Sequence, residues 1–149
     1  MGRPVKPLVI FADAQAAAAG VLRTALAGRS EPYAAGVTVG TRVPGDRSPE
    51  IPHLPYVLVR KDTDLPHSSM ANTRATLRVT VWHTDADQAH DLAQLCQGLL
   101  IVHSGPVIRG VRPATGPLAA VDDTSRGTPG SDIDLSTFTV LANVRPATA

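Results

Sequence analysis

Two kinds of hydrophobic spacing follow one another in the middle of the chain and predict a strand that leads directly into a helix. Over residues 74–82, apolar and polar residues alternate strictly, as in a strand with one face in the core. The apolar row comprises Ala75, Leu77, Val79 and Val81, and the opposite row comprises Arg74, Thr76, Arg78, Thr80 and Trp82. Over residues 85–102, apolar residues recur every three or four positions, which is typical of an amphipathic helix. Residues 84–87, at the junction, predict a capping box.

The same rules predict one further helix and four further strands. The helix covers residues 13–27, with Asp13 as its cap and Gly28 at its end. The strands are expected at residues 37–43, 56–60, 107–111 and 136–145, and Pro113 with Gly116-Pro117 is expected to end the third of these. Residues 44–55, 61–73 and 122–134 are expected to be connections. We expect at least one of the two long loops, 44–55 or 122–134, to dock on a neighbouring subunit or on a partner protein of the assembly.

This order of elements predicts the fold class. The 149 residues are expected to form a single domain, residues 1–149. Helix, three strands, helix and two strands favour an α+β fold, with a mostly antiparallel sheet of about five strands and two helices packed on one face. The other face of the sheet would carry the Arg74-to-Trp82 row, joined by alternate residues of the last strand as far as Arg145.

That polar sheet face is the candidate functional surface. Arg74, Arg78 and Trp82 share it because they are four residues apart on one strand. Arginine and tryptophan are favoured in protein interfaces, and arginine binds carboxylates with two parallel hydrogen bonds. We therefore predict a protein interface that also includes Arg42 and Arg145, with acidic groups on the partner. The alternative is a solvated face, with Trp82 lying over a loop of the same chain.

Composition narrows the choice of partner. The net charge of +1 provides no overall basic surface for DNA. Only five aromatic residues are present, which argues against single-stranded nucleic-acid binding through base stacking. The charges are unevenly distributed. Residues 1–84 hold ten Lys and Arg against six Asp and Glu, and residues 85–149 hold four against seven. This is either an ordinary scatter of solvated charge or a pair of oppositely charged faces that meet head to tail between copies.

Motifs for catalysis, cofactors and metals are absent from the sequence. It has no phosphate-binding glycine loop, nucleophile elbow or Cys-x-x-Cys pair, and its histidines lack metal-ligand spacing. Cys96 lies on the apolar side of its helix and is expected to be a small buried hydrophobe. The Asp62/Asp64 and Asp132/Asp134 pairs are expected in turns. We expect neither a catalytic site nor a cofactor. The apolar run at residues 8–12 is too short for a signal peptide, and no later run approaches transmembrane length, so we also expect no membrane segment.

The chain resembles the tail terminator proteins of phages with long, non-contractile tails. The likeness covers most of the chain and is carried by the order of elements and by four local patterns. These are Thr41-Arg42-Val43-Pro44, Val57-Leu58-Val59-Arg60-Lys61, the strand from Leu77 to Trp82 that runs into Asp85-Ala86-Asp87-Gln88-Ala89-His90-Asp91-Leu92-Ala93, and the closing Phe138-Thr139-Val140-Leu141 to Val144-Arg145-Pro146.

The resemblance implies a structural virion protein, made in the host cytoplasm, that caps the tail tube as a ring of six copies. Its partners would be itself, the tail tube protein and a head-side connector or closure protein, with no membrane and no sequence-specific nucleic acid. Two other interpretations stay open. One is a head-closure or adaptor ring of the same joint, and the other is a small α+β ligand-binding domain or enzyme.

Overall fold

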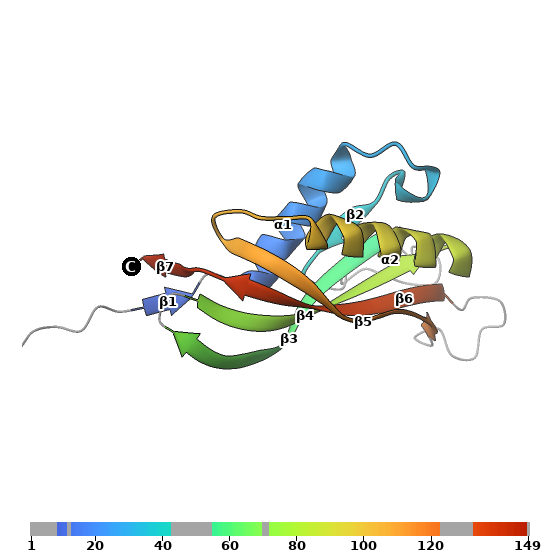
Figure 1. The fold of residues 1–149 in the computed structure, drawn as a ribbon. Coiled ribbons are helices and arrows are strands. Elements are labelled where there is room, and N and C mark those ends of the chain that lie inside the picture. The colour runs from blue at the N-terminus through green and yellow to red at the C-terminus, as the bar shows by residue number, and fades with distance from the viewer. Residues whose placement is uncertain (1–8, 12, 43–54, 70–71, 123–132, 149) are drawn as a thin grey trace, which may run out of the picture.

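The computed structural model describes residues 9–11, 13–42, 55–69, 72–122 and 133–148. The predicted order of helix, three strands, helix and two strands is confirmed, with short additional elements at both ends of the chain and after the first helix (Figure 1). The elements are β1 (Val9–Phe11), α1 (Ala14–Ala27), η1 (Pro32–Ala34), β2 (Thr38–Gly40), β3 (Tyr56–Ser69), β4 (Asn72–His83), α2 (Ala86–Ile101), β5 (Ile108–Asp122), β6 (Ile133–Val144) and β7 (Pro146–Thr148).

The main sheet has five strands in the order β2-β3-β4-β6-β5, so β4 lies at its centre. Only β2 runs parallel to its neighbour, and the other three pairings are antiparallel. The α+β class with a mostly antiparallel five-stranded sheet is therefore confirmed. Sequence analysis did not anticipate β1 and β7, which pair antiparallel in a separate two-stranded sheet.

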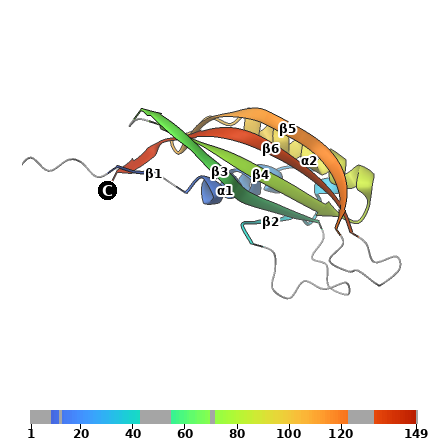
Figure 2. The ribbon, with the colours of Figure 1, turned by 90° about the horizontal axis from the view of Figure 1, so that it is seen from below.

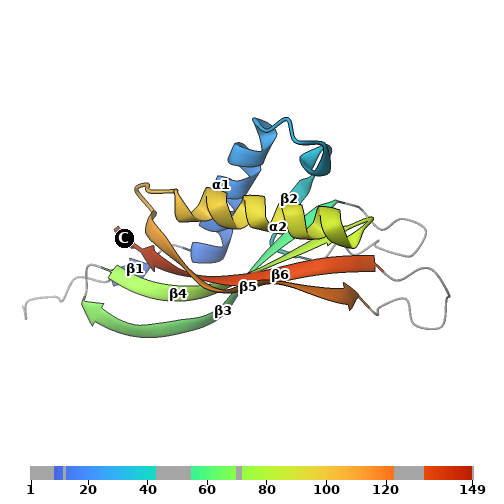
Figure 3. The same cartoon turned by 45° about the vertical axis from the view of Figure 1, so that its right-hand side comes forward.

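Both helices lie on the same side of the main sheet (Figures 1 and 3). The sheet side chains that face them are Val57, Val59, Ala75, Leu77, Val79, Val81, Phe138, Val140, Ala142 and Val144, all at most 1% exposed. Leu22 of α1 and Leu92 of α2 belong to the same buried cluster. The predicted apolar row of β4 is thus buried in the core beneath the helices. The opposite row lies on the face that no helix covers (Figure 2).

The helix starts are set by aspartates. Asp13 caps α1 by accepting a hydrogen bond from the Ala16 amide, with N and Oδ1 3.2 Å apart, as expected. For α2 the cap is Asp85, whose Oδ1 accepts from the Asp87 amide over 3.1 Å. The predicted capping box headed by Thr84 is wrong, because Thr84 precedes the cap and its hydroxyl contacts the His83 ring.

The polar stretch 61–73 is not a connection. β3 continues to Ser69 and β4 begins at Asn72, so the two strands form one long hairpin. Within this stretch the ladder with β4 pairs Lys61, Thr63, Asp64, Leu65 and Ser69, although the sequence here is mostly polar. The register shifts between Lys61 and Thr63 and again between Leu65 and Ser69, where the hairpin bends.

The prediction that β5 ends near Pro113 is also wrong, because the strand continues to Asp122. β5 is the edge strand beyond β6, and an edge tolerates prolines that have no amide hydrogen to donate. The register with β6 shifts three times along it. At Gly116, which has a φ of +77°, a Cβ would lie 2.6 Å from the Thr137 carbonyl oxygen, so glycine is required there.

The two predicted long loops lie mostly outside the described residues. Of residues 44–55 only Pro55 is described. The 122–134 connection is shorter than expected, because Asp122 and Ile133 pair in the β5–β6 ladder and the residues between them are outside the described part. The first predicted strand is reduced to β2 among the described residues.

Candidate protein interface on the outer face of the sheet

The face of the main sheet that points away from the helices is called the outer face below. Strand register determines which side chains share it. Arg78 of β4 lies opposite Arg60 of β3 and Thr139 of β6, and Thr139 in turn lies opposite Thr115 of β5. Figure 2 views the sheet from this side. The candidate surface therefore crosses four strands at the level of Arg78.

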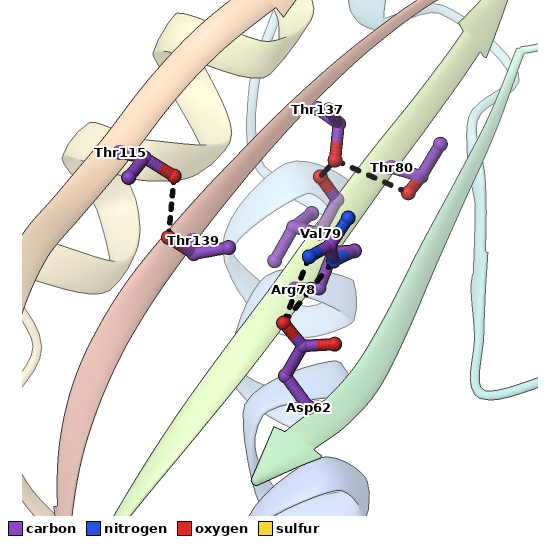
Figure 4. A network of polar contacts seen from close by, with 7 residues as sticks. All are labelled: Asp62, Arg78, Val79, Thr80, Thr115, Thr137 and Thr139. Atoms are coloured by element: carbon purple, nitrogen blue, oxygen red, sulfur yellow. Dashed lines mark hydrogen bonds and ion pairs between the residues drawn. The ribbon is translucent and has the colours of Figure 1, made fainter.

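Arg78 forms an ion pair with Asp62 on the outer face. Its Nη2 lies 2.9 Å, and its Nε 3.3 Å, from Oδ2 of Asp62 (Figure 4). Both side chains are well exposed, so this pair contributes little to folding stability. Its effect is on geometry, because it holds the guanidinium against β3. Asp62 was expected in a turn; it lies instead within β3.

Hydroxyl groups link the strands in the middle of the outer face (Figure 4). The Oγ1 atoms of Thr115 and Thr139 are 2.6 Å apart, and those of Thr80 and Thr137 are 3.4 Å apart. The Thr137 hydroxyl also donates to the Val79 carbonyl over 3.2 Å. These contacts join β4, β5 and β6 side by side, so the surface that surrounds the arginines is held in place by its own strands.

Trp82 lies on the predicted face but is buried within the chain, at 7% exposure. Its ring packs on Tyr56, with centroids 6.0 Å apart and planes inclined at 44°. Leu58 and the partly buried Leu135 complete this small cluster. Of the two predicted roles for Trp82, a contact within the chain is the one that the structure favours, and we leave Trp82 out of the proposed interface.

The other predicted interface residues are distributed along the sheet. Arg74 is exposed on β4, opposite Asn143, and extends the outer face beyond Arg78. Arg145 is exposed directly after β6, and its amide donates to the Val107 carbonyl over 2.9 Å. Arg42 is exposed at the opposite end, where its carbonyl accepts the hydroxyl of Tyr56. The structure therefore brings Arg74 and Arg78 to one surface, and Arg42 lies at the far end from Arg74.

Sequence analysis missed two exposed arginines of this surface. Arg60 lies opposite Arg78, and Arg112 of β5 lies opposite Leu141 of β6. Neither forms an ion pair with any residue that the structure describes. The sequence offered no local signal for Arg60, because it follows four successive buried residues, Tyr56 to Val59, and its cross-strand partner depends on the bulged register.

The remaining chemistry of the described residues does not converge on a site. Cys96 is buried as predicted, and its burial raises the pKa of the thiol to about 12. A cavity of about 270 Å³ lies beside the end of α1. Of its two arginines, Arg23 donates to the Val39 carbonyl over 3.0 Å and Arg29 pairs with Glu31. In the described part of the chain, no group of three His, Cys, Asp or Glu side chains could hold a metal ion.

His83 is the most constrained titratable group. Its Nδ1 accepts a hydrogen bond from the Thr84 amide over 2.8 Å, and its Nε2 lies 2.9 Å from the Tyr33 carbonyl oxygen. The side chain therefore ties the end of β4 to the turn at η1, which is a structural role.

Comparison with known proteins adds no family. No family model matches the chain, and no curated protein matches it in sequence. Within the described ranges, no helix has the length and apolar character needed to cross a membrane.

Proposed function

We propose that this protein is a structural subunit that caps the tail tube of a phage with a long, non-contractile tail and joins it to the head side, as a ring of six copies. The observation that carries the proposal is the outer face, where a sheet held by its own hydroxyl contacts presents exposed arginines rather than a catalytic cluster. The resemblance of the sequence to tail terminators supplies the identity of the assembly.

The physical properties of the outer face support assembly through protein contacts. Exposed arginines on a sheet surface offer two-pronged hydrogen bonds to carboxylates of a partner. A face already fixed by strand pairing loses little conformational entropy when it docks. A ring joins two different patches of each subunit, which suits a chain whose two halves carry opposite net charge.

The proposal is tested by adding the purified protein to isolated non-contractile tail tubes and imaging the tube ends by negative-stain electron microscopy. We expect a ring at one end of each tube. The variant R74E/R78E should fold normally, because exposed charge changes usually alter the free energy of unfolding by less than about 0.5 kcal/mol. It should nevertheless leave the tube ends bare.

Other outcomes separate the alternatives. Binding to isolated connectors but not to tubes would favour a head-closure or adaptor ring. A variant R74E/R78E that caps tubes as well as the wild type would exclude the outer face as the functional surface. A small molecule that binds stoichiometrically beside Arg23 and Arg29 would instead favour a ligand-binding domain.

A further inference from the structure

We infer that Arg60 and Arg78, called the arginine pair below, bind Asp87 and Asp91 of helix α2 of a second copy. This names the two surfaces of the contact between subunits, and it rests on the proposed function only in that both require self-assembly. The inference is drawn from the cross-strand register, the charges of α2 and the position of the two surfaces on opposite sides of the sheet.

The arginine pair is a like-charge contact in direct register. Residues directly opposite in an antiparallel pair have Cα atoms about 4.5–5.5 Å apart, and like charges at such positions are destabilising. Asp62 offsets only part of this repulsion, because it pairs with Arg78. Arg60 forms no ion pair with any described residue. Among the described residues, the pair therefore has one carboxylate for two guanidinium groups, which leaves it able to bind carboxylates of a partner.

Helix α2 presents those carboxylates. Asp87 and Asp91 are both exposed and one turn apart on the same side of the helix, about 6 Å along its axis. Neither side chain forms a hydrogen bond or ion pair with a described residue. The helix dipole accounts for an acid at Asp87, in the first turn, but its effect does not extend to Asp91. No lysine or arginine occurs anywhere on α2.

The spacings of the two surfaces match. The Cα atoms of residues paired across antiparallel strands lie about 4.5–5.5 Å apart, and residues four positions apart on a helix rise about 6 Å along its axis, so each arginine can face one aspartate. Beyond Asp91, the exposed side of α2 continues through Gln94 and Gly98, and no atom lies within 4 Å of a Cβ built at Gly98. A smooth, uncharged continuation would allow a flat sheet to approach the helix.

The contact has to be between copies, because α2 lies on the helix side of the sheet and the arginine pair lies on the outer face (Figures 1 and 2). It joins two different surfaces and is therefore heterologous, the type of contact that closes into a ring or continues as a filament. Lowering ionic strength should strengthen it, since the Debye length grows from about 10 Å at 0.1 M salt to about 30 Å at 0.01 M.

The test is a charge exchange read out as self-association by light scattering and native mass spectrometry at low ionic strength. Variant one is R60E/R78E and variant two is D87R/D91R. Each alone should associate at least about tenfold more weakly than the wild type, because like charges then meet at every contact. An equimolar mixture should recover association, since the reversed sheet of one variant faces the reversed helix of the other, and so should a chain that carries all four changes.

The control is a charge reversal at an arginine outside the proposed contact. R109E changes the net charge as much as R60E but lies on β5, away from the arginine pair, and should associate like the wild type. If R60E/R78E unfolds, R60Q/R78Q tests the same face without three adjacent acids. A wild type that stays monomeric at millimolar concentration, or a mixture that does not recover, would overturn the inference. If all the variants form rings like the wild type, the inferred contact is wrong but the proposed function stands. If the mixture recovers association but does not cap tubes, the contact stands and the proposed function is wrong.

Discussion

The phenol ring of Tyr56 occupies the space that a side chain at Gly40 would need. A Cβ at Gly40 would overlap the Tyr56 hydroxyl and lie 3.3 Å from Cζ of the same ring. Tyr56 can therefore lie across β2, where its hydroxyl donates to the Arg42 carbonyl, and its other side supports Trp82. The absence of a side chain at Gly40 thus leaves room for the ring on which Trp82, the only tryptophan in the chain, packs.

Replacing Gly40 with alanine should displace Tyr56 and lower the free energy of unfolding by about 1–3 kcal/mol, the usual effect of overpacking. Trp82 should become more exposed to water, so its fluorescence emission should shift to longer wavelength in the folded state. Denaturant unfolding and emission spectra check both effects.

The matched control is G20A, in the middle of α1, where no atom lies within 4 Å of a built Cβ. It should raise stability by about 0.5–1 kcal/mol, because alanine is the better helix former. If G40A were as stable as the wild type with an unchanged emission maximum, the packing of Tyr56 over Gly40 would be wrong.

Ser136 is a polar residue inside the core. It is fully buried between Val81 and Ala119 in the ladder, and its hydroxyl has no hydrogen-bond partner in the described part of the chain. Removing a buried hydroxyl without a partner also removes its desolvation penalty. S136A should therefore raise the free energy of unfolding by about 1 kcal/mol, whereas S104A, at an exposed position, should change it by less than about 0.5 kcal/mol. A loss of stability in S136A would mean that the hydroxyl has a partner.

Cys96 should make the fold sensitive to alkali. Burial raises the pKa of its thiol from near 9 to about 12 in the folded chain, so the folded state keeps the proton after the unfolded chain has lost it. The stabilising contribution is complete below pH 9 and is lost as the pH rises from about 9 toward 12. By pH 10.5 the wild type should lose about 2 kcal/mol more than C96A relative to pH 8.

The comparison with C96A isolates the thiol. Burial also raises the pKa of Tyr56, which destabilises the fold in the same direction, but both proteins contain that residue. Unfolding curves in urea at several pH values give the difference. Parallel dependence on pH in the two proteins would show that Cys96 is not buried as a neutral thiol.

Much of the fold follows from local pattern. The period-two alternation of β4 and the three- and four-residue spacing of α2 determine which sides are buried, and Asp13 and Asp85 cap helices close to the predicted starts. The extent of β5 could not be predicted, because proline is compatible with a strand only at an edge, and edge position is a property of the whole sheet.

The candidate surface was predictable only in part. Arg74 and Arg78 share a face because they lie on one strand, and the sequence shows this directly. The pairing of Arg60 with Arg78 depends on two register shifts in the β3–β4 hairpin. If the register of the Ser69–Asn72 pair continued unchanged along the strands, Arg60 would lie opposite Val81. Trp82 is buried against Tyr56, whose ring lies over Gly40, and no local pattern contains these contacts between residues distant in sequence.

Copies of this chain should assemble through two different surfaces into a closed ring. Native mass spectrometry of the purified wild type at about 0.01 M ionic strength, where charge contacts reach furthest, tests it most directly. We expect a largest closed species of six copies that dissociates as salt is added. A protein that remains monomeric up to millimolar concentration, or one that stops at a salt-insensitive two-fold dimer, would contradict it.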